Sequence, residues 1–202
     1  MQTFDKELGT RGMKGVYKES LVDLVNHNPK MDLIVLRIGL GEILDSAGGG
    51  DFVRFVSPAK KIEKHLVTTA KGSFIKARHL ILKNKWDVHI SHSDREILPY
   101  NDGEFNLLAD FSSLDKVSPV KIEKVLSEYN RVLKNDGKLL LFSWVTYYLC
   151  KQSGDFFYHV DKFKACLKQY FIVEEIHRYY IGGLVKRDDV SMMRFICRKK
   201  KV

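Results

Sequence analysis

The residues best suited to bind a ligand follow stretches whose composition predicts β-strands. Asp94 follows the stretch 88–92, and Asp110 and Phe111 follow a strand that opens on Phe105. Three aromatic residues follow the apolar stretch 139–142, namely Trp144, Tyr147 and Tyr148. An open α/β sheet binds its ligands outside the carboxyl ends of its strands, so we expect these side chains to share one site. The structural alternatives are that Asp94 only forms a turn with its own backbone and that the aromatic residues only pack on the core.

The elements between residues 88 and 144 indicate how these side chains are held. Apolar residues at i, i+1, i+4, i+7 and i+8 predict a helix with one apolar stripe: Val125, Leu126, Tyr129, Val132 and Leu133. Residues 134–137 then supply a cation, Asn and Gly, which favour the end of a helix. The run 139–142 suits a central parallel strand buried on both faces. Strand, helix and strand with short connections form a βαβ crossover, so the sequence predicts an α/β fold.

The same stretch resembles the second half of class I S-adenosylmethionine (SAM)-dependent methyltransferases, particularly their ubiquinone-biosynthesis-like, small-molecule branch. That family typically shows an acidic residue, then L-P-F/Y-x-D/N-x-x-F-D, and later E-x-x-R-V-L-K-P-G-G. The positions that fit are Asp94, Leu98, Pro99, Tyr100, Asp102, Phe105, Glu128, Arg131, Val132, Leu133, Lys134 and Gly137. The resemblance implies a Rossmann-like sheet, mostly parallel with an antiparallel carboxyl-terminal strand, and helices on both faces. The competing interpretation is a generic βαβ unit that needs the same turns.

The first half matches the family's cofactor-binding pattern only in part. Gly39 and Gly41 occupy the first two glycine positions of the loop after the first strand, but Arg37 stands in place of the usual acid. We interpret residues 52–56 as the second strand and 58–66 as the helix that follows it. This register places Phe55 where the family has its ribose-binding acid.

The resemblance implies SAM as the cofactor, with Asp94 at the adenine amino group and Asp110 and Phe111 near the sulfonium. The implied cofactor-binding residues are Gly39, Gly41, Phe55, Asp94, Arg95, Asp110 and Phe111. Hydrogen bonds to a charged acceptor contribute about 1.5–3 kcal/mol each, so losing two acids would remove about 3–6 kcal/mol. A micromolar ligand is held by about 8 kcal/mol, so affinity for SAM would fall toward the millimolar range unless other residues compensate.

Length and composition set further bounds. At 202 residues the chain can bury a full core, and we divide it into a helical lead-in over 1–30 and a single methyltransferase-like domain over 31–202. The amino terminus lacks the apolar segment of a secretion signal, and no apolar run is long enough to span a bilayer. Three widely spaced cysteines suit a cytoplasmic protein with reduced thiols. No metal site is expected, because His89 and His92 alternate along a strand.

The net charge of +9 lies mostly in one window. Residues 54–85 carry nine Lys or Arg and a single acid, Glu63, which gives 9 − 1 = +8. We expect two helices here, at 58–66 and 73–84, whose buried positions include Ile62, Leu66, Phe74, Ile81 and Leu82. The window is either a solvated surface or a contact surface for a protein partner or nucleic acid, formed by Lys60, Lys61, Lys64, Lys76 and Arg78.

The carboxyl-terminal part predicts an amphipathic helix at 161–171 and two strands at 171–182 and 191–199.

Two functions remain open. The first is a SAM-dependent methyltransferase of unknown acceptor, with its substrate against Trp144, Tyr147 and Tyr148. The second is a catalytically inactive scaffold of the same fold that binds a partner or nucleic acid through the basic window.

Overall fold

A computed structural model describes residues 3–8, 10–30, 32–38, 61–146, 151–152, 155–156, 158–181 and 190–200. Six predicted site residues lie outside these ranges: Gly39, Gly41, Phe55, Lys60, Tyr147 and Tyr148. Their roles stay predictions.

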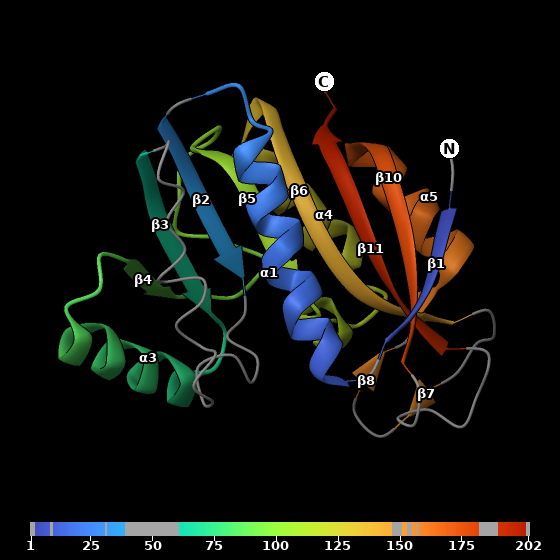
Figure 1. The fold of residues 1–202 in the computed structure, drawn as a ribbon, viewed down its shortest axis with the longest axis horizontal. Helices are drawn as coiled ribbons and strands as arrows, with labels where there is room; N and C mark the ends of the chain where they lie inside the picture. The colour runs from blue at the N-terminus through green and yellow to red at the C-terminus, as the bar shows by residue number, and fades with distance from the viewer. Residues whose placement is uncertain are drawn as a thin grey trace.

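Most of the described strands form one mixed sheet (Figure 1). Across the sheet the order is β1 (Thr3–Leu8), β10 (Phe171–Ile181), β11 (Val190–Lys199), β6 (Leu133–Thr146), β5 (Phe105–Phe111), β2 (Asp32–Ile38), β3 (Lys61–Thr68) and β4 (His89–His92). The short strand β9 (Tyr158–His159) pairs with β6, while β7 (Lys151–Gln152) and β8 (Asp155–Phe156) form a separate pair. Strands β2 to β6 run parallel, and β11 is antiparallel to both β6 and β10. The predicted fold class is confirmed.

Helices cover both faces of this sheet (Figure 1). Helix α1 (Thr10–Asn26) lies on one face, and α4 (Ile122–Val132) and α5 (Val160–Tyr170) lie on the other. Helix α3 (Lys71–Asn84) lies beside β3 and the edge strand β4. One turn of 3-10 helix, η2 (Leu114–Lys116), comes shortly after β5. Among the described residues no helix is long and apolar enough to cross a membrane.

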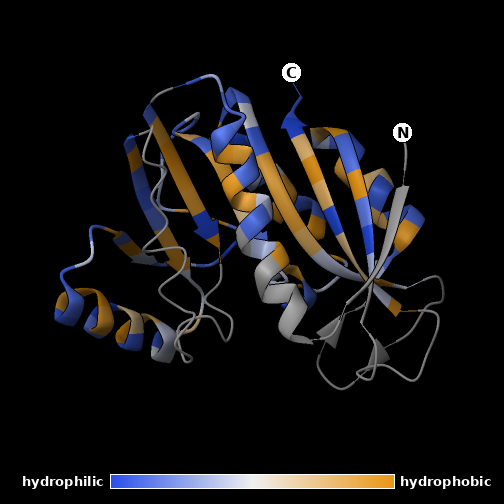
Figure 2. Ribbon diagram, viewed as in Figure 1, coloured by the Kyte–Doolittle hydropathy of each residue, from blue (hydrophilic) through white to orange (hydrophobic). Residues whose placement is uncertain are grey.

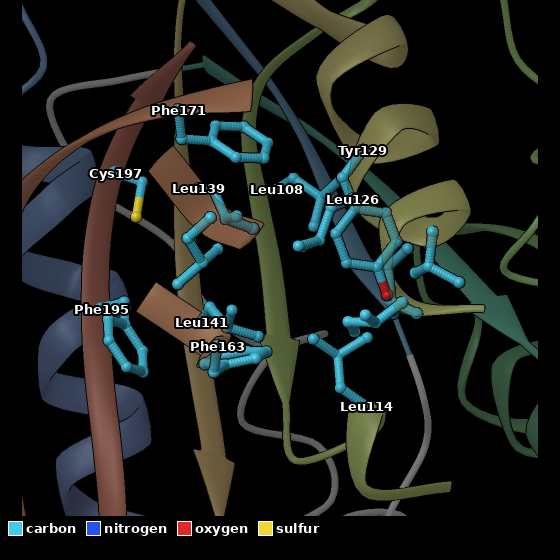
Figure 3. Packing of buried hydrophobic residues seen from close by; sticks show 14 of the residues in the cluster. Leu108, Leu114, Leu126, Tyr129, Leu139, Leu141, Phe163, Phe171, Phe195 and Cys197 are labelled. Atoms are coloured by element: carbon cyan, nitrogen blue, oxygen red, sulfur yellow. The ribbon is translucent and has the colours of Figure 1, made fainter. Parts of the chain in front are cut away.

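The main core lies between the sheet and the pair α4 and α5. Figure 3 shows Leu126 and Tyr129 of α4 packed toward Leu108 on β5, with Phe163 of α5 against β6. A second cluster joins α1 to the opposite face through Leu21, Leu24 and Val25. Strand β2 is mostly apolar in Figure 2, as expected for a strand covered on both faces.

Three sequence predictions need correction. Residues 3–8 form strand β1, which pairs with β10, so the predicted lead-in is helical only from Thr10 to Asn26. Residues 61–66 belong to strand β3, because their alternating side chains fit between β2 and β4. Leu82 is 68% exposed on the outer side of α3.

The predicted helix stop at 134–137 has a different role. Helix α4 ends at Val132, and residues 134–137 form an irregularity in β6 where the pairing with β5 shifts. A Cβ on Gly137 would lie 2.9 Å from the Lys134 carbonyl oxygen, so glycine is required by close backbone approach.

Candidate ligand site at the carboxyl edge of the sheet

The sheet changes its winding direction between β2 and β5. These strands pair in parallel, with Ile38 beside Asp110, yet the chain continues from β2 to β3 on one side and from β5 to β6 on the other. Ligands of open α/β sheets bind in the crevice outside the carboxyl ends of the strands at such a point. The candidate site is therefore the edge toward which the arrowhead of β2 points in Figure 1.

Residues from both parts of the methyltransferase-like pattern, 98–102 and 128–131, contact one another and hold one loop at this edge of the sheet. Arg131 donates two hydrogen bonds to the Glu128 carboxylate, from Nε at 2.8 Å and from Nη2 at 2.7 Å. Its guanidinium also donates to the carbonyl oxygens of Tyr100 and Leu98 and to Asp102. Glu128 in turn accepts the Leu98 backbone N–H at 2.6 Å. We call these five residues the loop clamp.

Electrostatics support the clamp. Burial alone would raise the pKa of Glu128, but the hydrogen bonds from Arg131 and the Leu98 backbone lower it overall. The hydrogen bond to Glu128 raises the pKa of Arg131 above its ordinary value, which is itself high. Both groups are therefore charged at neutral pH, and the loop between β4 and β5 is tied to α4.

That loop carries Asp94 and Arg95. Asp94 is exposed, and its Oδ1 accepts the backbone N–H of Glu96 at 3.0 Å, which is the turn anticipated as the structural alternative. Arg95 is half-buried, and its Nε donates to Ser113 Oγ at 3.1 Å. This contact joins the loop after β4 to the loop after β5.

Asp110 lies inside the protein rather than on the surface of the site. Its side chain is fully buried, where Oδ1 accepts the Ser113 N–H at 2.8 Å and Oδ2 accepts the hydroxyls of Ser113 at 2.7 Å and Tyr129 at 2.8 Å. Burial raises the pKa of Asp110, although the Ser113 hydrogen bonds and nearby Arg95 oppose the rise. Asp110 therefore positions the loop after β5.

Phe111 points to the opposite face of the sheet, beneath α1. The Tyr17 ring stacks on it at 4.9 Å with an interplanar angle of 8°, and the Arg37 guanidinium carbon lies 4.9 Å from the same ring centroid. Burial lowers the pKa of Arg37 to about 10, with Asp110 opposing, so Arg37 stays charged at neutral pH. Ser112, the next residue, has φ of 61°, a left-handed conformation that is uncommon for a residue other than glycine.

Trp144 lies near the carboxyl end of β6. It is half-buried, and its backbone N–H donates to Asp115 Oδ1 at 3.2 Å.

The structure thus brings Asp94, Arg95, Asp110, Phe111 and Trp144 to one edge of the sheet. Tyr17, Ser113 and Asp115 join them, and none of these three was selected from the sequence. For Tyr17, the spacing to Leu21 and Leu24 on one helix face could have indicated that it faces the sheet.

The described residues offer a second candidate for the ribose position. The strand beside β2 is β3, and its carboxyl end is Thr68. Phe55, the residue predicted from the sequence for this position, lies outside the described residues, and Thr68 is the described residue at the carboxyl end of the strand beside β2. Thr68 is 1% exposed, and its hydroxyl has no hydrogen-bond partner among the described residues.

The basic window is not formed by two outer helices. Lys61 and Lys64 are three residues apart on β3, so their side chains point to opposite faces of the sheet. Lys76 and Arg78 lie on α3, where both are exposed. Helix α3 also exposes Ile75 and Leu82, one on either side of Arg78 along one helix face.

Comparison with known proteins agrees with this architecture. Residues 46–141 match the family model for a methyltransferase domain. The fold is shared with a geranyl diphosphate C-methyltransferase from Streptomyces coelicolor A3(2), with TM-score 0.71, 12% identity, and coverage of 94% of this chain and 82% of that one. A SAM-dependent methyltransferase from Methanosarcina mazei gives TM-score 0.67, 12% identity, and coverage of 87% and 96%. The cyclase SpnF gives TM-score 0.70, 18% identity, and coverage of 91% and 81%. No curated protein sequence matches the chain significantly.

The chain has a class I methyltransferase-type fold, and the resemblance to SAM-dependent methyltransferases is confirmed by the match over 46–141. The ubiquinone-biosynthesis-like branch stays a prediction.

Proposed function

We propose that this protein is a SAM-dependent methyltransferase that acts on a small-molecule acceptor. The observation that carries the proposal is the methyltransferase-domain match over residues 46–141, which spans the segment from before β3 into β6. The winding change between β2 and β5 supports a ligand at the same edge.

Part of the described edge suits an adenosine group. The exposed carboxylate of Asp94 can accept a hydrogen bond from an adenine amino group, and the Thr68 hydroxyl, which has no partner among the described residues, can pair with a ribose hydroxyl. A neutral hydroxyl forms weaker hydrogen bonds than a carboxylate. Arg37 is cationic where the family pattern has an acid, which disfavours a cationic ligand group nearby. We therefore expect SAM to bind more weakly than about 100 micromolar, in line with the loss of two charged hydrogen bonds.

Bound SAM would supply an activated methyl group on a sulfonium. Methyl transfer depends mainly on alignment of the acceptor, so the protein's contribution is to hold that acceptor in place. The stacked rings of Tyr17 and Phe111, with Trp144 farther along the edge, offer an aromatic surface for this purpose. An apolar or aromatic small molecule is the acceptor class that such a surface favours.

Calorimetric titration of SAM and S-adenosylhomocysteine into the full chain tests the proposal. Thr68→Asp restores an acid at the end of β3 and should tighten SAM binding about tenfold, because one charged hydrogen bond is regained. Phe55→Asp is the matched comparison, since it places the acid at the other candidate position, and it should not tighten binding if Thr68 is the residue at the ribose. If neither ligand binds below about 5 millimolar and folded Thr68→Asp gives no gain, the methyltransferase proposal is wrong.

Exposed features of α3 support a second candidate, an inactive scaffold that binds nucleic acid. The helix carries four exposed cationic side chains: Lys71, Lys76, Arg78 and Lys83. Contacts to phosphates release counterions, so binding should weaken steeply with salt and should not depend on base sequence. Gel shifts with transfer RNA and duplex DNA at two salt concentrations should show this behaviour, and Arg78→Glu should weaken it. A lack of binding below about 10 micromolar at low salt would leave the helix as a solvated surface.

A further inference from the structure

Three side chains with metal-binding atoms lie together on β3 and on β4, the last strand at this side of the described sheet. Glu63 and His65 are two residues apart on β3, so they point to the same face. His89 on β4 is the direct register partner of His65. His65 Nε2 lies 2.7 Å from Glu63 Oε1, His89 Nε2 lies 3.9 Å from the same oxygen, and the three ligand atoms all lie within 4.8 Å of one another.

The surroundings hold His65 in place and leave the other two side chains accessible. His65 is buried, and the rings of Tyr100 and Phe105 pack against it edge-on with centroids at 5.5 and 5.2 Å. The His89 ring stacks on His65 at 4.7 Å. The His89 side chain is 64% exposed, and Glu63 is also exposed, so an ion could reach the cluster from solvent.

We propose that Glu63, His65 and His89 form a site for one divalent transition-metal ion, with Zn²⁺ as the best-suited ion. Two imidazoles with one carboxylate suit Zn²⁺, Cu²⁺, Ni²⁺ or Co²⁺, whereas Mg²⁺ and Ca²⁺ prefer oxygen ligands alone. In a tetrahedral zinc site with bonds near 2.1 Å the ligand atoms lie about 3.4 Å apart. The observed separations of 2.7 and 3.9 Å lie on either side of that value, so small side-chain rotations suffice.

The metal site is separate from the candidate cofactor site. His65 and His89 lie three residues before Thr68 and His92 on the paired strands, which is about 10 Å back from the carboxyl edge. Glu63 lies two residues farther toward the amino end of β3. A metal ion here would join β3 to β4, the edge strand of the described sheet, and would not touch a ligand at the carboxyl edge.

The affinity of this site should be moderate. Histidine ligands are normally held by a hydrogen bond at the other ring nitrogen, and losing such a partner weakens metal binding about 10–100-fold. Nδ1 of His65 is buried and has no partner among the described residues. We therefore expect micromolar affinity rather than the tighter binding of a structural zinc site.

Calorimetric titration of ZnCl₂ into the reduced full chain tests the proposal. One equivalent should bind with micromolar affinity, and Zn²⁺ should raise the melting temperature of the wild type. His89→Ala changes an exposed side chain and should weaken binding at least about tenfold, as should Glu63→Gln, because each removes a direct ligand. His79→Ala is the matched control, since His79 is an exposed histidine on α3, and its binding should match the wild type.

Absorption spectra of the Co²⁺-loaded protein give a second readout, because imidazole and carboxylate ligation changes the visible bands of the ion. The proposal is overturned if His89→Ala and Glu63→Gln both bind Zn²⁺ as well as the wild type, which would assign binding to other residues. Absence of any binding below about 1 millimolar would overturn it as well.

Discussion

Replacing Arg131 is the sharpest test of the loop clamp. Arg131→Ala removes hydrogen bonds to the Glu128 carboxylate, to Asp102 and to the carbonyl oxygens of Leu98 and Tyr100. The contact with exposed Asp102 contributes little, because surface ion pairs contribute about 0–1 kcal/mol. The Glu128 side chain is only 12% exposed, and leaving a buried charge without its partner costs about 3–5 kcal/mol.

We therefore expect Arg131→Ala to lower the free energy of unfolding by about 3–5 kcal/mol, a large share of the 5–15 kcal/mol typical of a domain. Arg131→Lys should lose about 1.5–3 kcal/mol, because an ammonium cannot pair with both carboxylate oxygens while also reaching the loop. Urea denaturation measures both values. Arg78→Ala is the matched control on the surface of α3 and should change stability by less than about 0.5 kcal/mol.

A double-mutant cycle with Glu128→Gln isolates the pair. Removal of Arg131 should be less harmful when residue 128 is already neutral, with a coupling energy above about 1.5 kcal/mol. The Glu128 pKa is lowered in the folded state, so its stabilisation is present above the ordinary value of 4.5 and is lost as pH falls through the folded value. The stability gap between wild type and Glu128→Gln should thus shrink in acid. A coupling below about 0.5 kcal/mol at neutral pH would refute the clamp.

Three further substitutions test the fold around the candidate site. Asp110→Asn should destabilise the protein less at pH 7 than at pH 4. The folded-state pKa of Asp110 is raised, so wild-type stability falls as pH rises above the ordinary value of 3.8, and asparagine does not have this loss. Thermal melts at both pH values measure the difference in stability between wild type and Asp110→Asn, and a difference that does not change with pH would contradict the prediction. Gly137→Ala should cost about 1–3 kcal/mol in urea denaturation, because the new Cβ meets the Lys134 carbonyl oxygen at 2.9 Å, and a neutral result would show that the irregularity in β6 can relax. Lys85→Gly should raise stability by about 0.5–1 kcal/mol, because Lys85 ends α3 with φ of 52°; a lower melting temperature would instead assign a stabilising contact to its side chain.

The second half of the fold could be predicted because several local signals agree there. The apolar stripe through Val125 and Tyr129 predicted α4, and both side chains are fully buried against the sheet. The continuous apolar run 139–142 predicted the centre of β6, which lies between β5 and β11. The antiparallel pair at the carboxyl terminus followed from its strand-forming composition and was also confirmed.

The segment before α3 was misjudged because its signals were ambiguous. Ile62 and Leu66 are four residues apart, a spacing that places two side chains on one face of either a helix or a strand. Ser57 and Pro58 suggested a helix start, which outweighed the run of β-forming residues that ends at Thr68. The grouping of Glu63, His65 and His89 could not be predicted for a different reason. His65 and His89 are far apart in the sequence and become neighbours only through the parallel pairing of β3 and β4.

The position of β1 affects how this chain folds during synthesis. Thr3 pairs with Ile176, so β1 is synthesised long before β10 and finds its partner only after more than 160 further residues have been made. Pairings of such high sequence separation form slowly, because the closure of a long loop opposes them until other contacts exist. Until β1 docks, β10 is an open sheet edge that can pair with another chain. Nascent or stressed protein should therefore self-associate through β10, and strand β1 acts as its internal protection against aggregation.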